Sequence, residues 1–175
     1  SPEAYINLAN VMVIKEKSDL AKKILYKIIE LNPKYLRPYS NLAGILVGER
    51  NFEKAEFFLR KSLEISPKDI NTLVNLGCVL KDLGNSKQAE KFLRDALEIN
   101  PKFDSALVNL GAVLNELGKI DEGEQFLRKA LKINPDSPMA LNNLGNILSK
   151  KNKNKEAELL YRKAIELKSD FPPAY

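Results

Sequence analysis

Hydrophobic residues recur along this chain in short blocks, with members three or four residues apart, as on one face of a helix. Polar turns separate the blocks, and the whole pattern returns every 34 residues. The clearest marker of this period is a proline within the segments LNPKY, ISPKD, INPKF and INPDS, at Pro33, Pro67, Pro101 and Pro135. A fixed period of this length predicts an array in which one small supersecondary unit is stacked on copies of itself.

The period divides the chain into five repeats, 2–35, 36–69, 70–103, 104–137 and 138–171, followed by the start of a sixth at 172–175. We interpret residues 1–175 as a single array and number the positions within each repeat from 1 to 34. Each repeat has two apolar blocks, which predict two helices of roughly 13 residues, about 20 Å long. A turn is expected near position 15, where Gly84, Gly118 and Asn152 suit the left-handed residue that ends a helix.

Two positions of the repeat carry small residues throughout. Position 8 is Ala9, Ala43, Gly77, Gly111 and Gly145, and position 20 is Ala21, Ala55, Ala89, Gly123 and Ala157. We expect these positions to lie where two helices cross, so that the backbones approach closely. A bulky side chain there would force the helices apart and cost about 1–3 kcal/mol.

This pattern resembles the tetratricopeptide repeat (TPR) family, whose unit has Leu-Gly at positions 7 and 8, Ala at 20 and Pro at 32. The departures are Ile28, where the family prefers Ala, and Ser169 in place of the last proline. The resemblance implies an all-α fold, a right-handed superhelical solenoid of antiparallel helix pairs, in which the first helix of each pair lines an inner, concave side. It also implies a protein–protein interaction module.

Position 6 of the repeat is asparagine in all five copies: Asn7, Asn41, Asn75, Asn109 and Asn143. Asparagine costs several tenths of a kcal/mol in a helix interior relative to Ala, and an exposed stripe does not need it for packing. Its amide can pair with both the N–H and the C=O of an extended peptide. This arrangement is similar to the asparagine ladder in the TPR superhelix of O-linked N-acetylglucosamine transferase. The alternatives are inheritance by duplication, or bonding only to the neighbouring repeat.

Neighbouring positions extend the predicted peptide-binding stripe on the first helices. We assign to it the polar residues Asn10, Arg37, Asn71, Lys81, Asn142 and Asn146. Apolar residues are expected between them: Ile6, Val13, Ile14, Val47, Val74, Cys78, Val108 and Met139. A groove of this mixed character suits an extended protein segment better than a highly charged ligand. The lysines of the carboxylate clamp found in TPR co-chaperones are missing at position 5, which argues against a chaperone-tail adaptor.

The composition argues against chemistry in this chain. There is no histidine and a single cysteine, Cys78, so the commonest general base and metal ligand are missing, and an internal disulfide is excluded. We therefore expect no catalytic residue, no metal and no cofactor, and not an enzyme. The cysteine content gives no sign of an oxidising compartment. The sequence does not determine the compartment, and we expect the cytoplasm.

The net charge of +5 raises the question of nucleic-acid binding. The formal charges of the five repeats are +2, +1, +1, −2 and +3, so no basic track is continuous. We expect no nucleic-acid partner. No apolar stretch reaches the roughly 18 residues that a membrane helix needs, so we expect no membrane partner.

Glutamate at position 21 and arginine at position 25 form pairs expected to stabilise the second helices from repeat 2 onward.

Two further interpretations of function remain open. The array is the substrate-recruiting arm of a larger enzyme such as a glycosyltransferase, or it associates end to end. End-to-end association is suggested by the apolar side of the last helix, where Leu160, Ala164 and Leu167 are expected to be exposed.

Overall fold

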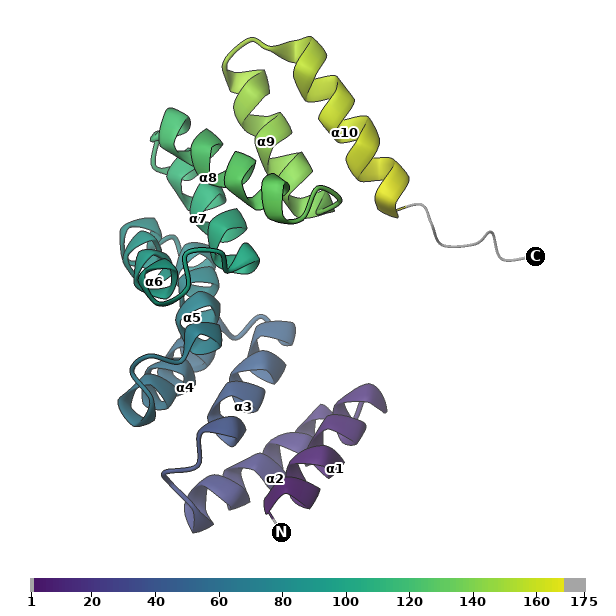
Figure 1. Cartoon of the computed structure of the whole chain (residues 1–175). Helices are drawn as coiled ribbons and strands as arrows, with labels where there is room; N and C mark the ends of the chain where they lie inside the picture. Colours follow the sequence, from purple (N-terminus) through teal and green to yellow (C-terminus); the bar gives the residue numbers. More distant parts are fainter. Residues whose placement is uncertain (1, 169–175) are drawn as a thin grey trace, which may run out of the picture. The chain divides into compact units, whose positions relative to one another are not determined.

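The computed structural model describes residues 2–168, and this part of the chain contains ten α-helices and no strand. Figure 1 shows them in chain order. The first helices of the five repeats are α1 (Pro2–Ile14), α3 (Leu36–Gly48), α5 (Ile70–Asp82), α7 (Asp104–Glu116) and α9 (Pro138–Lys150). The second helices are α2 (Ser18–Leu31), α4 (Phe52–Ile65), α6 (Ser86–Ile99), α8 (Ile120–Ile133) and α10 (Asn154–Lys168). The expected all-α class is confirmed, whereas Ser169 and 172–175 lie outside the described residues.

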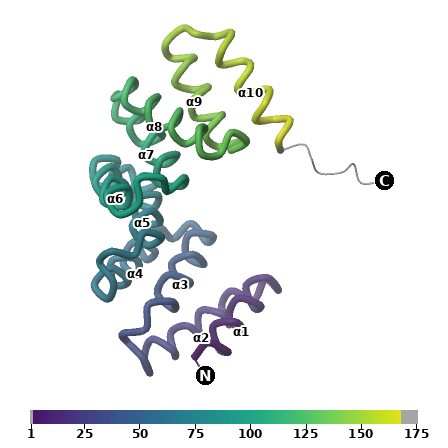
Figure 2. The backbone as a smooth tube through the Cα atoms, in the orientation of Figure 1, coloured from purple at the N-terminus to yellow at the C-terminus, as the bar shows by residue number. Residues whose placement is uncertain are grey.

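The helices gather into two compact units, Ser1–Asn85 and Ser86–Tyr175. In the first unit each helix from α1 to α5 packs on the next, and α1 also touches α3. In the second unit α6 to α10 do the same, and α7 touches α9. The tube in Figure 2 shows that consecutive helices such as α1 and α2, or α9 and α10, run antiparallel. First helices of successive repeats thus come into contact, α1 with α3 in the first unit and α7 with α9 in the second.

The turn inside each repeat contains one residue with left-handed backbone. The φ angle is +79° at Gly84, +77° at Gly118 and +59° at Asn152, which confirms the predicted helix ends. Glu16 and Arg50 occupy the same position of the first two repeats with φ of 57° and 58°. Tertiary packing imposes this turn there as well, although a side chain with a Cβ is strained in the left-handed region.

Helices cross closely at the small residues, as expected. A Cβ built on Gly123 would lie 2.9 Å from the carbonyl oxygen of Gly111 on the facing helix α7. A Cβ on Gly111 would lie 2.5 Å from Cγ of Leu127, and one on Gly145 would lie 2.6 Å from the Tyr161 ring. The paired helices can approach this closely only because Gly111, Gly123 and Gly145 have no side chain.

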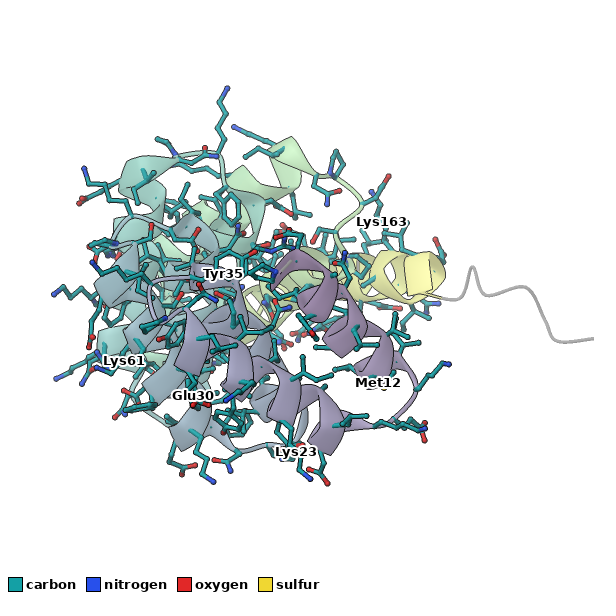
Figure 3. All side chains as sticks on the ribbon, turned by 90° about the horizontal axis from the view of Figure 1, so that it is seen from below. Met12, Lys23, Glu30, Tyr35, Lys61 and Lys163 are labelled. Atoms are coloured by element: carbon teal, nitrogen blue, oxygen red, sulfur yellow. The ribbon has the colours of Figure 1, made fainter. Side chains whose placement is uncertain are left out.

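The second helices carry the predicted Glu–Arg pairs. Glutamate binds the arginine four residues later at 2.7–2.8 Å in Glu56–Arg60, Glu90–Arg94, Glu124–Arg128 and Glu158–Arg162. In the second unit the pairs also reach the next repeat, because Lys119 Nζ donates to Glu90 at 2.8 Å and Lys151 Nζ donates to Glu124 at 2.7 Å. Figure 3 shows other charged side chains of second helices, among them Lys23 and Lys61, at the outer edge of the first unit.

The exposed side of α10 differs from the prediction. Ala164 is buried, and Leu160 and Leu167 are half-buried. The exposed apolar residues of α10 are instead Leu159 and Ile165. The reason is that Leu160, together with Tyr161, turns toward the core that α8 and α9 form in the second unit.

Replacing Arg50 by glycine should stabilise the protein. Glycine adopts the left-handed conformation without the steric cost of a Cβ, so Arg50→Gly should raise the free energy of unfolding by about 1 kcal/mol. Denaturant unfolding followed by circular dichroism measures the change. Gly84→Ala is the matched control and should lose a similar amount, whereas a destabilised Arg50→Gly would contradict this account of the turn.

The Glu124 contacts should make stability depend on pH. The hydrogen bond from Lys151, opposed by burial and helped by Arg128, lowers the pKa of the Glu124 carboxyl. A lowered folded-state pKa means that the ionised carboxylate stabilises the fold above its unfolded pKa, and that this contribution is lost as the pH falls through the folded pKa. Glu124→Gln should therefore lose less stability than the parent between about pH 6 and about pH 3.

Thermal unfolding across this pH range is the measurement. The control is Glu158→Gln, since the Glu158 side chain is 60% exposed and bonds to Arg162 of its own helix. This control removes a carboxylate that contacts only its own helix, which separates the effect of the contact with the next repeat from that of losing any one carboxylate. Parallel stability curves for Glu124→Gln and the parent would contradict a role for the Lys151 contact.

Candidate functional site

The five position-6 asparagines lie on the first helices and reach the surface. We call Asn7, Asn41, Asn75, Asn109 and Asn143 the amide stripe. The first three belong to α1, α3 and α5 of the first unit, and the last two to α7 and α9 of the second. Asn7 and Asn75 are exposed and the other three are half-buried. Each asparagine directly precedes the position-7 leucine, which is fully buried in repeats 2 to 4, so the two side chains point about 100° apart around the helix.

One member of the stripe bonds to its neighbouring repeat. The side-chain Nδ2 of Asn41 donates to Oδ1 of Asn10 at 3.0 Å, from α3 to α1. This contact is of the kind expected if the recurrent asparagine bonds to the neighbouring repeat rather than to a ligand. It uses one of the two N–H groups of Asn41, so the carbonyl oxygen and the other N–H are left over for a further partner.

An open groove of about 600 Å³ lies beside this asparagine pair in the first unit. Asn10, Val13 and Ile14 of α1 form one side. The other side comes from α3, where Gly44 and Gly48 have no side chain to fill the space; a Cβ on either would meet no atom within 4 Å. The groove is therefore polar at the amides and apolar between them.

A smaller pocket of about 160 Å³ lies further along the same unit, between α3 and α5. Gly44 also borders this pocket, so the glycine connects the two hollows. Asn75 and Cys78 line it from α5. The Asn75 amide makes no hydrogen bond with another described residue, and Cys78 is half-buried. Burial raises the pKa of the Cys78 thiol, so it is protonated at neutral pH.

The asparagines of the second unit are more constrained. Nδ2 of Asn109 donates to the backbone oxygen of Ser105 in its own helix at 2.8 Å. Oδ1 of Asn146 accepts a hydrogen bond of 2.8 Å from the Tyr161 hydroxyl, which joins α9 to α10. Asn143 is half-buried and Asn142 is exposed. The described residues offer neither of these two amides a hydrogen-bond partner.

Of the remaining polar residues predicted for the stripe, Arg37 and Asn71 are exposed and Lys81 is half-buried. Arg37 forms an ion pair with Glu3, so its charge is already matched within the first unit. Lys81 lies 3.5 Å from the carboxylate of Asp82, and Asn71 is exposed at the start of α5. The charged residues thus occur in pairs of opposite sign. Glu49, which lines the groove of the first unit, is likewise paired, with Lys22 at 2.7 Å.

Three apolar residues predicted for the surface are instead in the core. Ile6, Val74 and Val108 at position 5 are buried, with exposed fractions of 0%, 5% and 3%. Position 5 contributes to packing because neighbouring first helices lie side by side, so one more position of each helix is covered. Val13, Ile14, Val47 and Met139 are exposed, as expected. The sequence analysis did not include Gly44 and Gly48 among the groove-lining residues. Their signal was glycine within a predicted helix, which is unfavourable there unless the missing side chain serves a purpose.

The described residues contain no group of three or more Cys, Asp or Glu side chains that could hold a metal ion. None of the helices within 2–168 is both long and apolar enough to cross a bilayer. The site is therefore a surface of amides, small hollows and paired charges.

Profile comparison identifies the class of protein that this architecture defines. Tetratricopeptide repeat profiles match residues 2–35, 39–102 and 103–170, which together cover most of the chain. The chain therefore belongs to the tetratricopeptide repeat family, whose members typically serve as protein–protein interaction modules. No curated protein sequence matches it.

Several solved structures share the fold. YrrB, described as a TPR protein with an unusual peptide-binding site, is 24% identical with a TM-score of 0.74, covering 95% of this chain and 86% of its own. PilF of Pseudomonas aeruginosa is 23% identical with a TM-score of 0.83, covering 94% and 75%. MamA of Desulfovibrio magneticus RS-1 is 19% identical with a TM-score of 0.83, covering 98% and 97%. At this level of identity the likeness establishes the fold alone.

Proposed function

We propose that the amide stripe binds the main chain of an extended segment of a partner protein. The observation that carries this proposal is the recurrence of asparagine at one surface position in all five first helices, where packing does not require an amide. Each free amide can donate to a peptide carbonyl and accept from a peptide N–H. Contacts of this kind read the backbone, so they tolerate variation in the partner's side chains.

The first unit is the better candidate for the initial contact. Its groove of about 600 Å³ offers space beside Asn10 and Asn41, and the Asn75 amide makes no hydrogen bond with another described residue. In the second unit, Asn109 and Asn146 each make one hydrogen bond within the protein, which a ligand would share or displace. YrrB, which has the same fold, has a peptide-binding site of its own, and this is in line with the proposal.

A peptide selected on the protein tests the proposal. Random peptides about 12 residues long, which span about 40 Å when extended, would be displayed and selected on the immobilised protein. The best binder is then labelled, and its Kd is measured by fluorescence anisotropy. Asn41→Ala with Asn75→Ala, both in the first unit, should raise this Kd about thirtyfold, since two hydrogen bonds contribute about 2 kcal/mol.

The matched control is Asn32→Ala with Asn134→Ala. These asparagines are exposed at the C-terminal ends of α2 and α8 and do not belong to the amide stripe. Helicity should be unchanged in both double variants, and the control should keep the parent Kd. An undiminished affinity in Asn41→Ala with Asn75→Ala would refute the proposed role of the stripe.

Self-association is a second candidate function, favoured by the exposed side of α1. Tyr5 is 57% exposed and Leu8 43%, whereas Leu42, the residue equivalent to Leu8 in repeat 2, is fully buried because α2 packs on α3. A second helix of another copy could cover α1 in the same way. The exposed Ile165 of α10 is the corresponding candidate on the other molecule, since its equivalent Leu131 is half-buried in repeat 4.

Light scattering over a concentration series measures this association. The parent should gain mass as its concentration approaches about 1 mM, the range of a weak association. Leu8→Lys should stay monomeric, because burying a lysine charge against α10 is unfavourable. Leu159→Lys is the control and should behave like the parent, since position 22 is also exposed at Phe57. A parent that stays monomeric throughout the series would rule out this function.

A further inference from the structure

The pocket of about 160 Å³ between α3 and α5 has a specific cause in the sequence. At position 9 of the repeat, α3 has Gly44 and α5 has Cys78, both small. A Cβ added to Gly44 would meet no atom within 4 Å, so the space in front of it is open. Asparagine occupies the equivalent place on α1, as Asn10. The small residues at position 9 of α3 and α5 therefore leave space for the hollow.

The inner walls of this pocket are apolar. Leu59 of α4 and Val79 of α5 line it and are buried, and Val47 of α3 borders it with an exposed side chain. Its polar groups, the Asn75 amide and the Asp82 carboxylate, come from α5. They are spaced so that Asn75, Cys78 and Asp82 share one face of the helix.

The size of the pocket sets a limit on its occupant. An apolar cavity of about 150 Å³ is large enough to hold a benzene ring. A pocket of 160 Å³ thus has room for one branched or aromatic side chain, while the main chain to which it is attached stays outside. The carboxylate of Asp82 has a single ionic contact among the described residues, with Lys81 at 3.5 Å, and so disfavours an acidic side chain in the pocket.

We propose that this pocket anchors one apolar side chain of the extended protein segment, while the Asn75 amide bonds to the main chain next to it. The inference rests on the proposed function, since it assigns a side-chain preference to the same surface. It adds specificity to binding that otherwise reads only the backbone. The segment must carry an apolar, non-acidic residue at the position facing Gly44 and Cys78.

Cys78 allows the pocket to be tested without knowing the partner, because it is the only cysteine in the chain. Two small disulfides serve as probes, each with cysteamine as the leaving group, one carrying a benzyl thiol and the other a 2-carboxyethyl thiol. The Cys78 thiolate attacks the sulfur of the probe thiol, forms a mixed disulfide with it and releases cysteamine as its thiolate. The reaction is run at about pH 8.5 in excess 2-mercaptoethanol, so that labelling reaches equilibrium.

Intact mass gives the fraction labelled by each probe. The benzyl probe should label the parent about tenfold more than the carboxyethyl probe at equal concentration, because burial of its ring in the pocket favours the mixed disulfide. Gly44→Leu fills the hollow and should abolish this preference. Gly48→Leu is the matched control, because Gly48 also lies on α3 with open space before it but does not line this pocket. It should keep the parent ratio.

Equal labelling of the parent by both probes would overturn the inference, and so would a preference that survives Gly44→Leu. The ratio of the two probes corrects for any change in the general reactivity of Cys78. The selected peptide separates this inference from the function on which it rests. If Asn75→Ala weakens its binding but Gly44→Leu does not, the amide stripe stands and the anchor pocket falls. If the benzyl probe is preferred but the asparagine variants bind the peptide as well as the parent does, the anchor pocket stands and the amide stripe falls.

Discussion

In the fourth repeat the carbonyl oxygen of Gly111 lies where a Cβ on Gly123 would come within 2.9 Å of it, so two helix backbones meet with no side chain between them. The same positions carry alanine or glycine in every repeat. This close approach brings the leucines at positions 7 and 24 into the shared core, where Leu110 and Leu127 are fully buried. Larger residues at the crossing would separate the helices and open voids around these leucines.

Packing covers most positions of each first helix, so only a few residues of that helix remain on the surface. Asparagine recurs on that face but differs in its contacts from repeat to repeat. Asn41 is tied to Asn10 and Asn109 to its own helix, whereas Asn75 makes no hydrogen bond with another described residue. The residue at this position is thus constant, whereas its hydrogen bonds within the protein differ from repeat to repeat.

Much of the repeat could be predicted from local patterns. The period placed the helix pairs, and glycine at position 15 marked the left-handed turns at Gly84 and Gly118. The same turn at Arg50 could not be predicted, because arginine has no preference for that conformation and only the packing of α3 against α4 requires it. Position 5 was misassigned at Ile6, Val74 and Val108, since the width of the buried face depends on how closely adjacent first helices lie.

The amino-acid sequence by itself determined the repeat length, the helix pairs, the small residues at the crossings and the constant asparagine, because each of these follows from local conformational preference or side-chain size. Tertiary structure decided which surface positions are accessible and which amides are already bonded. It also decided that Gly44 and Cys78 border a hollow of about 160 Å³. These properties depend on distances between helices that are far apart in the chain, and residue preferences carry no information about such distances.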